Sequence, residues 1–215
     1  TGLIGFLPEY GLPGAETVDG PAGVRLSENC TAWPVGTLQA CTWDPELIEQ
    51  VGKAVAVEAK QNGGDIWLAP ALNIHRNPLC GRNFEYYSED PLVSGKIAAA
   101  ITRGTQSEKV AVSIKHFAGN NRESNRGYQD SRMSERALRE IYLKGFEICV
   151  KEADPWTVMS SYNLINGTET SESSALLTTI LRNEWGFKGM VMSDWWNDST
   201  AYREANAGND IKMGT

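Results

Sequence analysis

The chain has 215 residues, of which 41% are hydrophobic and 22% are charged, as expected for one globular domain with a sizeable core. Its formal net charge of −7 argues against a surface that binds nucleic acid or an anionic membrane. No apolar stretch reaches the roughly 18–20 residues that a bilayer span requires, so we expect neither nucleic acid nor a membrane as a partner.

The first residues, Thr1 to Leu7, include no initiator Met and no basic segment, so they match neither a natural start nor a signal peptide. We expect the chain to begin inside a longer protein, and the compartment is left open. The cysteines do not form the C-x-x-C pattern of a zinc site and are expected to be free, mostly buried thiols: Cys30, Cys41, Cys80 and Cys149. Because His75 and His116 lie far apart, we expect no metal site, and we expect no other cofactor.

The first predicted strand is short and ends at Asp19. The turn signal Gly20-Pro21 fixes the Asp19 carboxylate at the strand end, with Arg25 close enough in sequence to pair with it. The alternative is that Asp19 only caps its own turn.

A helix is predicted to start at Asp44-Pro45-Glu46, with Asp44 as the N-cap and Pro45 at the first helical position. Gly63-Gly64 ends it, and the apolar residues at helical spacing are Ile48, Val51, Val55 and Ala59. A compact apolar strand follows at 65–70.

The loop at 73–90 is unusually polar and follows the end of that strand. Such a loop, rich in charges, is the expected form of a binding loop, although a merely solvated loop is the alternative. Its polar and aromatic residues are His75, Arg76, Arg82, Asn83, Glu85, Tyr86, Tyr87 and Glu89.

The second helix is predicted to start at Asp90-Pro91 and to end near Gly104, with Val93, Ile97, Ala100 and Ile101 inward. The following strand, 110–114, leads into Lys115 and His116. We expect these two side chains to face the hydroxyl or anionic groups of a ligand, unless one points outward as an ion-pair partner.

A polar loop at 120–130 contains Arg126, and Ser134 is predicted to cap the next helix. The inward residues of that helix are predicted to be Leu138, Ile141, Phe146 and Cys149. A strand at 157–162 and a helix ending near Trp185-Gly186 complete the series, the latter carrying Leu176, Leu177, Ile180 and Leu181.

The last predicted strand is the apolar run that starts at Gly189 and ends abruptly at Asp194, followed by Trp195 and Trp196. A carboxylate at a strand's carboxyl end, beside an aromatic wall on which a sugar ring could stack, is a candidate nucleophile or base. The alternative is an N-cap for the segment that follows.

Strands and helices therefore alternate along the chain, which predicts an α/β fold with a (β/α)8 TIM-like barrel, a doubly wound sheet being the alternative. The barrel is favoured because five polar residues follow the carboxyl ends of different strands, and only a closed ring brings so many ends to one site: Asp19, Arg82, Lys115, Tyr162 and Asp194. Because a complete barrel takes about 250 residues, this one is expected to be truncated before its last strand.

Several motifs, in this order and covering nearly the whole chain, resemble family 3 glycoside hydrolases and particularly their β-glucosidases: 19–25 (DGPAGVR), 81–91 (GRNFEYYSEDP), 115–121 (KHFAGNN), 134–140 (SERALRE) and 193–195 (SDW). The resemblance implies that residues 1–215 are a partial barrel domain. It also implies retaining, exo-acting hydrolysis of terminal non-reducing β-D-glucosyl residues through a covalent intermediate.

Within this resemblance, Asp194 matches the catalytic nucleophile. Residues that line the sugar pocket in relatives match Asp19, Arg25, Arg82, Lys115, His116, Arg126, Met159, Tyr162 and Trp195. Lys115, His116 and Arg126 could supply a favourable field for an ionised nucleophile, and Tyr162 could hydrogen-bond the Asp194 carboxylate. Trp196 departs from the small residue common at its position, which is expected to alter the leaving-group side.

A retaining mechanism also needs an acid/base carboxyl about 5–5.5 Å from the nucleophile. The resemblance implies that this Glu comes from a separate α/β sandwich domain, which residues 1–215 do not contain. The family's N-acetylglucosaminidases instead use a His in a Gly-rich loop, and the corresponding segment 118–124 has no His. The expected partners are a β-glucoside or β-linked oligosaccharide and the remainder of the same enzyme, with an oligomer left open.

Three other interpretations remain open: a non-catalytic carbohydrate-binding barrel fragment, a β-xylosidase, and an aldolase-like barrel in which Lys115 forms a Schiff base. We also expect that residues 1–215 alone do not form a stable, active enzyme, because an incomplete barrel leaves unpaired sheet edges.

Overall fold

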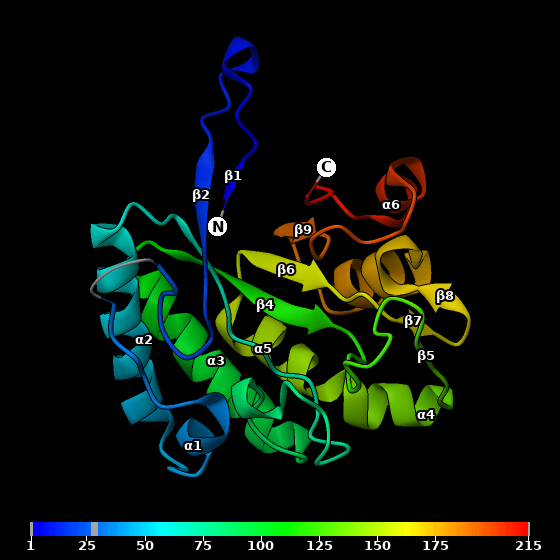
Figure 1. Ribbon diagram of the computed structural model, residues 1–215, viewed down its shortest axis with the longest axis horizontal. Helices are drawn as coiled ribbons and strands as arrows, with labels where there is room; N and C mark the ends of the chain where they lie inside the picture. The colour runs from blue at the N-terminus through cyan, green and yellow to red at the C-terminus, as the bar shows by residue number, and fades with distance from the viewer. Residues whose placement is uncertain (1, 27–29, 215) are drawn as a thin grey trace.

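The computed structural model describes residues 2–26 and 30–214. Its main sheet has the order β1-β2-β3-β4-β6-β9 (Figure 1). These strands are β1 (Gly2–Ile4), β2 (Ala15–Asp19), β3 (Ile66–Leu68), β4 (Ala111–Phe117), β6 (Thr157–Ser160) and β9 (Met190–Met192). β1 is antiparallel to β2, and every other pair in this sheet is parallel.

Helical segments connect the parallel strands in turn: α2 (Pro45–Gln61), α3 (Pro91–Ser107), α5 (Lys144–Ala153) and the π-helical η5 (Ala175–Glu184). In Figure 1, α2, α3 and α5 lie side by side against the sheet, and α3 contacts both α2 and α5. The predicted α/β fold of the TIM-like barrel type is confirmed. Within the described residues the sheet does not close, because β1 and β9 are not paired with each other.

The central strands β3, β4 and β6 are buried on both faces, as a barrel wall requires. In β3, Trp67 belongs to the large core that the helices share with the sheet, whereas Ile66 and Leu68 belong to a smaller core on the opposite face. Val191 and Met192 of β9 divide between the two cores in the same way. The smaller core is therefore the interior of the curved sheet.

The predicted helix starts are confirmed. The Asp44 carboxylate accepts a hydrogen bond from Leu47 N at 3.0 Å, and that of Asp90 accepts one from Leu92 N at 2.7 Å. The Ser134 hydroxyl accepts one from Ala137 N at 3.2 Å, where α4 (Glu135–Ala137) begins. Each cap satisfies an amide that has no partner inside its helix.

α3 ends at Ser107, so Gly104 lies near its end, as predicted. Gly104 is also a point where α3 approaches α2 closely, since a Cβ there would lie 2.0 Å from Glu49 O. Gly52 of α2 has the same function, because its Cβ would lie 2.5 Å from Ile101 O. Both glycines therefore permit close helix packing rather than helix termination.

The prediction that Ile141 faces the core is wrong, since its side chain is exposed. It lies in the π-helical segment η3 (Leu138–Tyr142), between α4 and α5. A π-turn inserts a residue and rotates the following side chains, so Leu138 and Phe146 are buried although Ile141 is not.

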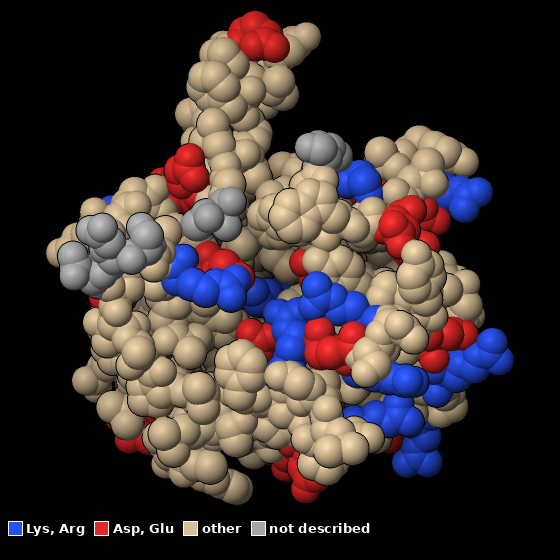
Figure 2. Space-filling model, viewed as in Figure 1, with Lys and Arg blue, Asp and Glu red and all other residues tan. Residues whose placement is uncertain are grey.

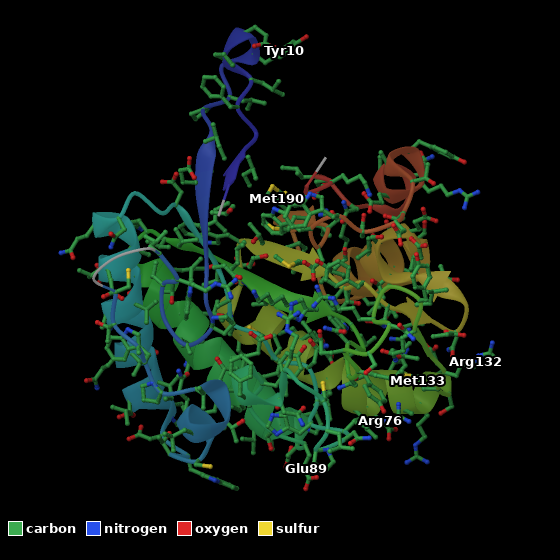
Figure 3. All side chains as sticks on the ribbon, in the orientation of Figure 1. Tyr10, Arg76, Glu89, Arg132, Met133 and Met190 are labelled. Carbon is green, nitrogen blue, oxygen red and sulfur yellow. The ribbon has the colours of Figure 1, made fainter. Side chains whose placement is uncertain are left out.

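Several elements were not predicted. The β1–β2 hairpin, with η1 (Pro8–Tyr10) at its tip, projects from the body of the molecule, and Figure 3 labels Tyr10 there. A small second sheet has the order β5-β7-β8, formed by β5 (Asp130–Ser131), β7 (Leu164–Ile165) and β8 (Thr168–Glu169). The short helices are α1 (Gly36–Ala40), η2 (Asn83–Glu85), η4 (Thr170–Glu172) and α6 (Ala201–Ala207).

The prediction of mostly buried thiols holds for two of the four cysteines. Cys80 and Cys149 are buried, whereas Cys30 is half-buried and Cys41 is exposed. Burial raises the pKa of the Cys149 thiol to about 12. None of the described helices combines the length and the apolar character needed to cross a membrane.

Candidate functional site

All ten predicted site residues line one cavity of about 490 Å³, which we call the site cavity. Its predicted residues are Asp19, Arg25, Arg82, Lys115, His116, Arg126, Met159, Tyr162, Asp194 and Trp195. The other residues that line it were not among the ten, although Glu85 was placed in the predicted binding loop and Trp196 in the aromatic wall: Pro21, Leu68, Phe84, Glu85 and Trp196. The carboxyl ends of β2, β4, β6 and β9 carry Asp19, Lys115, Met159 and Asp194, so the fold brings the strand ends together as expected.

Asp19, at the end of β2, is held by two cations. Lys115 Nζ donates to Asp19 Oδ1 at 2.8 Å, and the Arg25 guanidinium contacts Oδ2. Burial alone would raise the pKa of Asp19, but Lys115 and Arg25 outweigh it and lower the pKa to about 2. Asp19 also accepts a bond from Gly20 N at 2.8 Å, so it caps its turn as well as binding the cations.

Lys115 and His116 both face the site cavity, which corrects the alternative that one of them points outward. They also lie inside β4, which extends to Phe117 and not only to Ile114 as predicted. Consecutive side chains of a regular strand point to opposite faces. The register of β4 against β6 shifts between Ile114 and Phe117, so the strand is irregular where both side chains line one cavity.

The Asp194 carboxylate is buried, with its residue only 7% exposed. Its Oδ1 accepts a hydrogen bond from Trp195 N at 2.8 Å, whereas Oδ2 has no hydrogen-bond partner among the described residues. Burial raises the pKa of Asp194, and Lys115 and Arg82 partly offset that effect. The N-cap interpretation is wrong, because the next helix, α6, begins at Ala201 with Thr200 as its N-cap.

His116 Nε2 lies 3.8 Å from Asp194 Oδ2. Burial lowers the pKa of His116 well below its usual value, and the positive charges of Arg82, Lys115 and Arg126 lower it further. The imidazole is therefore neutral at pH 7 and does not form an ion pair with Asp194.

The Tyr162 hydroxyl interacts both with the Asp194 carboxylate, as predicted, and with a backbone carbonyl. The Tyr162 hydroxyl donates to the carbonyl oxygen of Trp195 at 2.7 Å. It still lies close enough to Asp194 to lower the pKa of that carboxyl. Arg126 stacks on the Tyr162 ring, 4.3 Å from its centroid, and its Nη1 donates to Glu123 Oε2 at 2.9 Å.

Glu85 is the buried carboxylate that the sequence interpretation did not select. It forms an ion pair with Arg82, three residues earlier, and both side chains are largely buried. Burial would lower the pKa of Arg82, but Tyr86 and Glu85 outweigh it and raise it. An acidic residue at i+3 from a predicted site arginine is the signal that could have identified Glu85.

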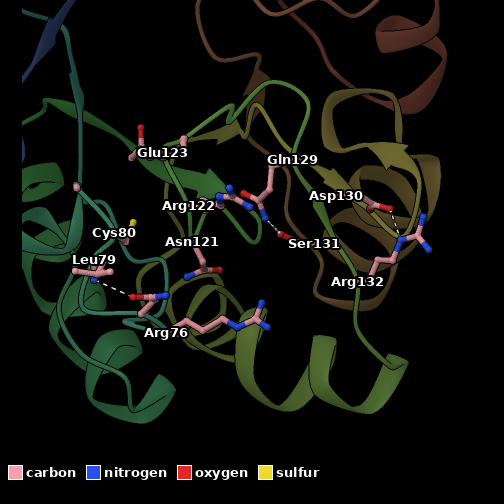
Figure 4. A pocket seen from close by; sticks show the side chains of 13 residues that line it. Arg76, Leu79, Cys80, Asn121, Arg122, Glu123, Gln129, Asp130, Ser131 and Arg132 are labelled. Carbon is pink, nitrogen blue, oxygen red and sulfur yellow. Dashed lines mark hydrogen bonds and ion pairs between the residues drawn. The ribbon is translucent and has the colours of Figure 1, made fainter.

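A larger cavity, of about 820 Å³, lies between the loops 76–81 and 121–132 (Figure 4). Its charged residues are Arg76, Arg122, Glu123, Asp130 and Arg132, and none of the ten predicted site residues lines it. Because it lacks Asp194 and the buried charges around it, we assign the chemistry to the smaller site cavity. The predicted binding loop 73–90 contributes residues to both cavities.

Basic and acidic side chains gather across the middle of the face shown in Figure 2. They alternate there and do not form a patch of one sign. In the part of the chain that the structure describes, no group of three or more His, Cys, Asp or Glu side chains is placed to hold a metal ion.

Comparison with known proteins places this arrangement among carbohydrate-active enzymes. Residues 9–212 match the model of the glycosyl hydrolase family 3 N-terminal domain. Beta-glucosidase A of Butyrivibrio fibrisolvens is 58% identical over 214 residues, which cover 98% of this chain and 26% of that relative. An exo-alpha-(1->6)-L-arabinopyranosidase of Bifidobacterium breve is 47% identical over 94% of this chain and 28% of its own length.

Among solved structures, beta-glucosidase 3B of Thermotoga neapolitana in complex with glucose superposes with a TM-score of 0.95 at 52% identity. The match covers 99% of this chain and 31% of that structure. The chain thus spans about a quarter of the length of the curated relatives it matches.

Proposed function

Because this chain belongs to glycosyl hydrolase family 3, we propose that its site cavity binds the terminal non-reducing sugar of a β-glucoside and that Asp194 is the nucleophile of a retaining hydrolysis. The beta-glucosidase relatives support the substrate class. A covalent glycosyl–Asp194 intermediate would then form on the enzyme and be hydrolysed by water.

One observation carries this proposal: Asp194 Oδ2 is buried in the cavity and has no hydrogen-bond partner in the described part of the chain. A buried carboxylate oxygen without a partner is costly for the fold, so it calls for a functional explanation. A carboxylate oxygen that lines the cavity without a close geometric partner is placed to attack an anomeric carbon.

The surroundings of Asp194 act on its charge in two opposite ways, and the net effect raises its pKa. Burial disfavours its charge, but Lys115 and Arg82 supply a positive field that offsets part of this effect. Asp19, which is ionised at neutral pH, provides acceptors for sugar hydroxyls on the other side of the cavity. Trp195 supplies an apolar wall on which a sugar ring can stack.

The general acid is proposed to come from outside residues 1–215. Among the described residues, Glu85 is the other acidic residue besides Asp19 and Asp194 that lines the site cavity, and its carboxylate is already engaged in an ion pair with Arg82. We therefore propose that residues 1–215 form a partial barrel domain, and that a further domain of the full-length protein supplies the acid/base carboxyl.

The test is to react the full-length gene product with 2,4-dinitrophenyl 2-deoxy-2-fluoro-β-D-glucoside and to map the labelled peptide by mass spectrometry. We expect the label on Asp194 and no label in an Asp194→Asn variant. Label on another carboxylate would overturn the assignment of the nucleophile.

The sugar preference is measured by comparing the rates at which the same full-length protein hydrolyses a panel of p-nitrophenyl glycosides. A relative at 47% identity is named an exo-alpha-(1->6)-L-arabinopyranosidase, so the panel includes the arabinopyranoside and xyloside beside the glucoside. Glucosides with good leaving groups need little acid assistance. If the full-length protein released nothing even from these, the non-catalytic binding interpretation would replace the proposal.

A further inference from the structure

Trp196 has a backbone conformation that bulky residues rarely adopt. Its φ is 53°, in the left-handed region, and its side chain is exposed, at 75% of the maximum. A left-handed conformation in a bulky non-glycine residue costs free energy and persists only where the surroundings impose it. Both the strain and the exposed indole therefore call for an explanation.

Hydrogen bonds on one side of Trp196 impose this conformation. Trp196 N donates to Met213 O at 3.2 Å, and Met213 N donates to Ser193 Oγ at 2.8 Å. These two bonds therefore hold Ser193 and Trp196, which flank Asp194 and Trp195, against the segment that contains Met213. That segment runs beside β9, because Ile211 forms a parallel bridge with Met192.

On the other side, an ion pair between a buried carboxylate and a partly buried lysine holds the loop that follows Trp196. Glu204 of α6 is 1% exposed, and its Oε1 accepts from Asn197 Nδ2 at 2.7 Å and lies 3.6 Å from Lys212 Nζ. Lys212 Nζ in turn donates to Ser199 O at 2.9 Å and contacts Asn197. We call Glu204 and Lys212 the clasp; it fixes Asn197 and Ser199, and with them the direction of Trp196.

The indole that is fixed in this way borders two cavities. The site cavity adjoins a second cavity of about 290 Å³, and the two share Arg126, Tyr162, Trp195 and Trp196. The adjoining cavity contains the polar residues Glu169, Ser171, Asn197 and Asp198, but neither Asp19 nor Lys115. A group attached to a sugar bound at Asp19 and Lys115 would therefore extend past Asp194 along the two tryptophans.

We propose that Trp196 is a specificity-determining residue whose indole binds the leaving group, an aromatic ring or a second sugar, and that the clasp positions it. This inference rests on the proposed function of the site cavity. Aromatic rings pack on one another and on the apolar faces of sugars, so a fixed indole at this point selects flat or ring-shaped leaving groups over small ones.

The experiment compares two substrates in the full-length protein and its Trp196→Gly variant. p-Nitrophenyl β-D-glucoside has an aromatic leaving group, whereas the leaving group of β-D-glucosyl fluoride is too small to reach the indole. We expect kcat/KM for the aryl glucoside to fall about 10-fold through a higher KM, while that for the fluoride changes less than about 2-fold. Equal losses on both substrates, or no loss on either, would overturn the proposal.

Trp43→Gly is the matched control. Trp43 is also left-handed, with a φ of 54°, and is 78% exposed, but it lines neither cavity. The same chemical change relieves the same backbone strain there, so we expect unchanged kcat/KM on both substrates. A selective aryl loss in this variant as well would show that the effect does not arise at Trp196.

The clasp is tested with Lys212→Met beside Lys151→Met, which breaks an exposed ion pair with Glu147. If Lys212 positions Trp196, its loss raises KM for the aryl glucoside selectively, and Lys212→Arg restores part of the affinity. A Lys212→Met variant that loses activity equally on both substrates has only a structural defect, and the clasp is then not a positioning device.

A binding measurement separates this inference from the proposed function. If the full-length protein hydrolyses neither substrate, the proposed reaction fails, but the affinity for phenyl β-D-thioglucoside relative to glucose still reports on Trp196. We expect Trp196→Gly to lower that ratio about 10-fold. An unchanged ratio would overturn the specificity assignment whatever the catalytic result.

Discussion

Lys115 Nζ lies 2.8 Å from Asp19 Oδ1, which joins two side chains that are 96 residues apart in the sequence. β3 separates their strands in the sheet, so the ion pair crosses the mouth of the curved sheet. The Lys115 side chain is only 4% exposed, and that of Asp19 is 23% exposed. The pair therefore lies in a partly desolvated site, where removing one partner affects the other strongly.

The ionised Asp19 carboxylate is expected to make the protein less stable as the pH falls into the acid range. Its pKa is about 2 in the folded protein against an ordinary value of 3.8, so the folded state favours the ionised form. That contribution is fully present above the ordinary pKa and is lost as the pH falls toward 2; from the shift it amounts to about 2 kcal/mol. We expect denaturant titrations between about pH 6 and pH 2.5 to show a steeper loss of stability in the wild type than in Asp19→Asn. Parallel curves would contradict this.

Lys115→Met leaves the Asp19 carboxylate with Arg25 as its remaining cation. Because the partly buried carboxylate then keeps only the largely exposed Arg25 as a partner, we expect a loss of about 3 kcal/mol in unfolding free energy at pH 7. Lys96→Met serves as the control, since Lys96 forms an exposed pair with Glu152 and should cost less than about 1 kcal/mol. Equal effects in urea denaturation would mean that the site pair is screened like a surface pair.

Asp194→Asn is expected to stabilise the protein while it abolishes activity. Burial raises the pKa of Asp194, so the folded state favours the protonated form, and ionisation above the ordinary pKa destabilises the fold. The neutral amide avoids this, and its gain in Tm should be present at pH 7 and shrink as the pH approaches the ordinary value of 3.8. Activity on aryl glucosides should fall about 10⁴-fold or more. A lower Tm at pH 7 would show that the carboxylate stabilises the fold.

Gly104→Ala tests the contact between α2 and α3. The added methyl would lie 2.0 Å from Glu49 O, which is backbone and cannot move aside cheaply. We expect a destabilisation of about 1–3 kcal/mol by chemical denaturation. Gly127→Ala, where the methyl meets no atom within 4 Å, should change stability by less than about 0.5 kcal/mol. Similar values for both variants would refute the close-packing explanation.

Residues 1–215 expressed alone are predicted not to form a stable, active enzyme. Within the described residues, β1 and β9 are the two edges of an open sheet, and open edges pair readily with other chains. Thermal unfolding, light scattering and aryl glucosidase assays of this fragment test the point. A monomer that unfolds cooperatively and turns over at about 1–1000 per second would disprove it.

The sequence by itself determined the repeating α/β architecture, because that information is local. Asp44, Asp90 and Ser134 cap the helices they were expected to cap, since each needs only its own next three residues. Asp19, Lys115 and Asp194 could be assigned to one site because each follows or ends a parallel strand, and parallel strands in a barrel end on the same side. The resemblance to family 3 added residues such as Met159 whose types alone would not have identified them.

Only the tertiary structure decided which partner each side chain takes. Asp19 pairs with Lys115, and Tyr162 donates to Trp195, because the positions of segments far apart in the chain choose among several equally plausible partners. A glycine such as Gly104 looks the same in the sequence whether it ends a helix or allows a neighbouring helix to pack closely. Only the position of α2 in the structure shows that Gly104 has the packing role. The burial that raises the pKa of Asp194, and the strained backbone that presents Trp196, arise from segments folded around them, so no pattern of neighbouring residues encodes either.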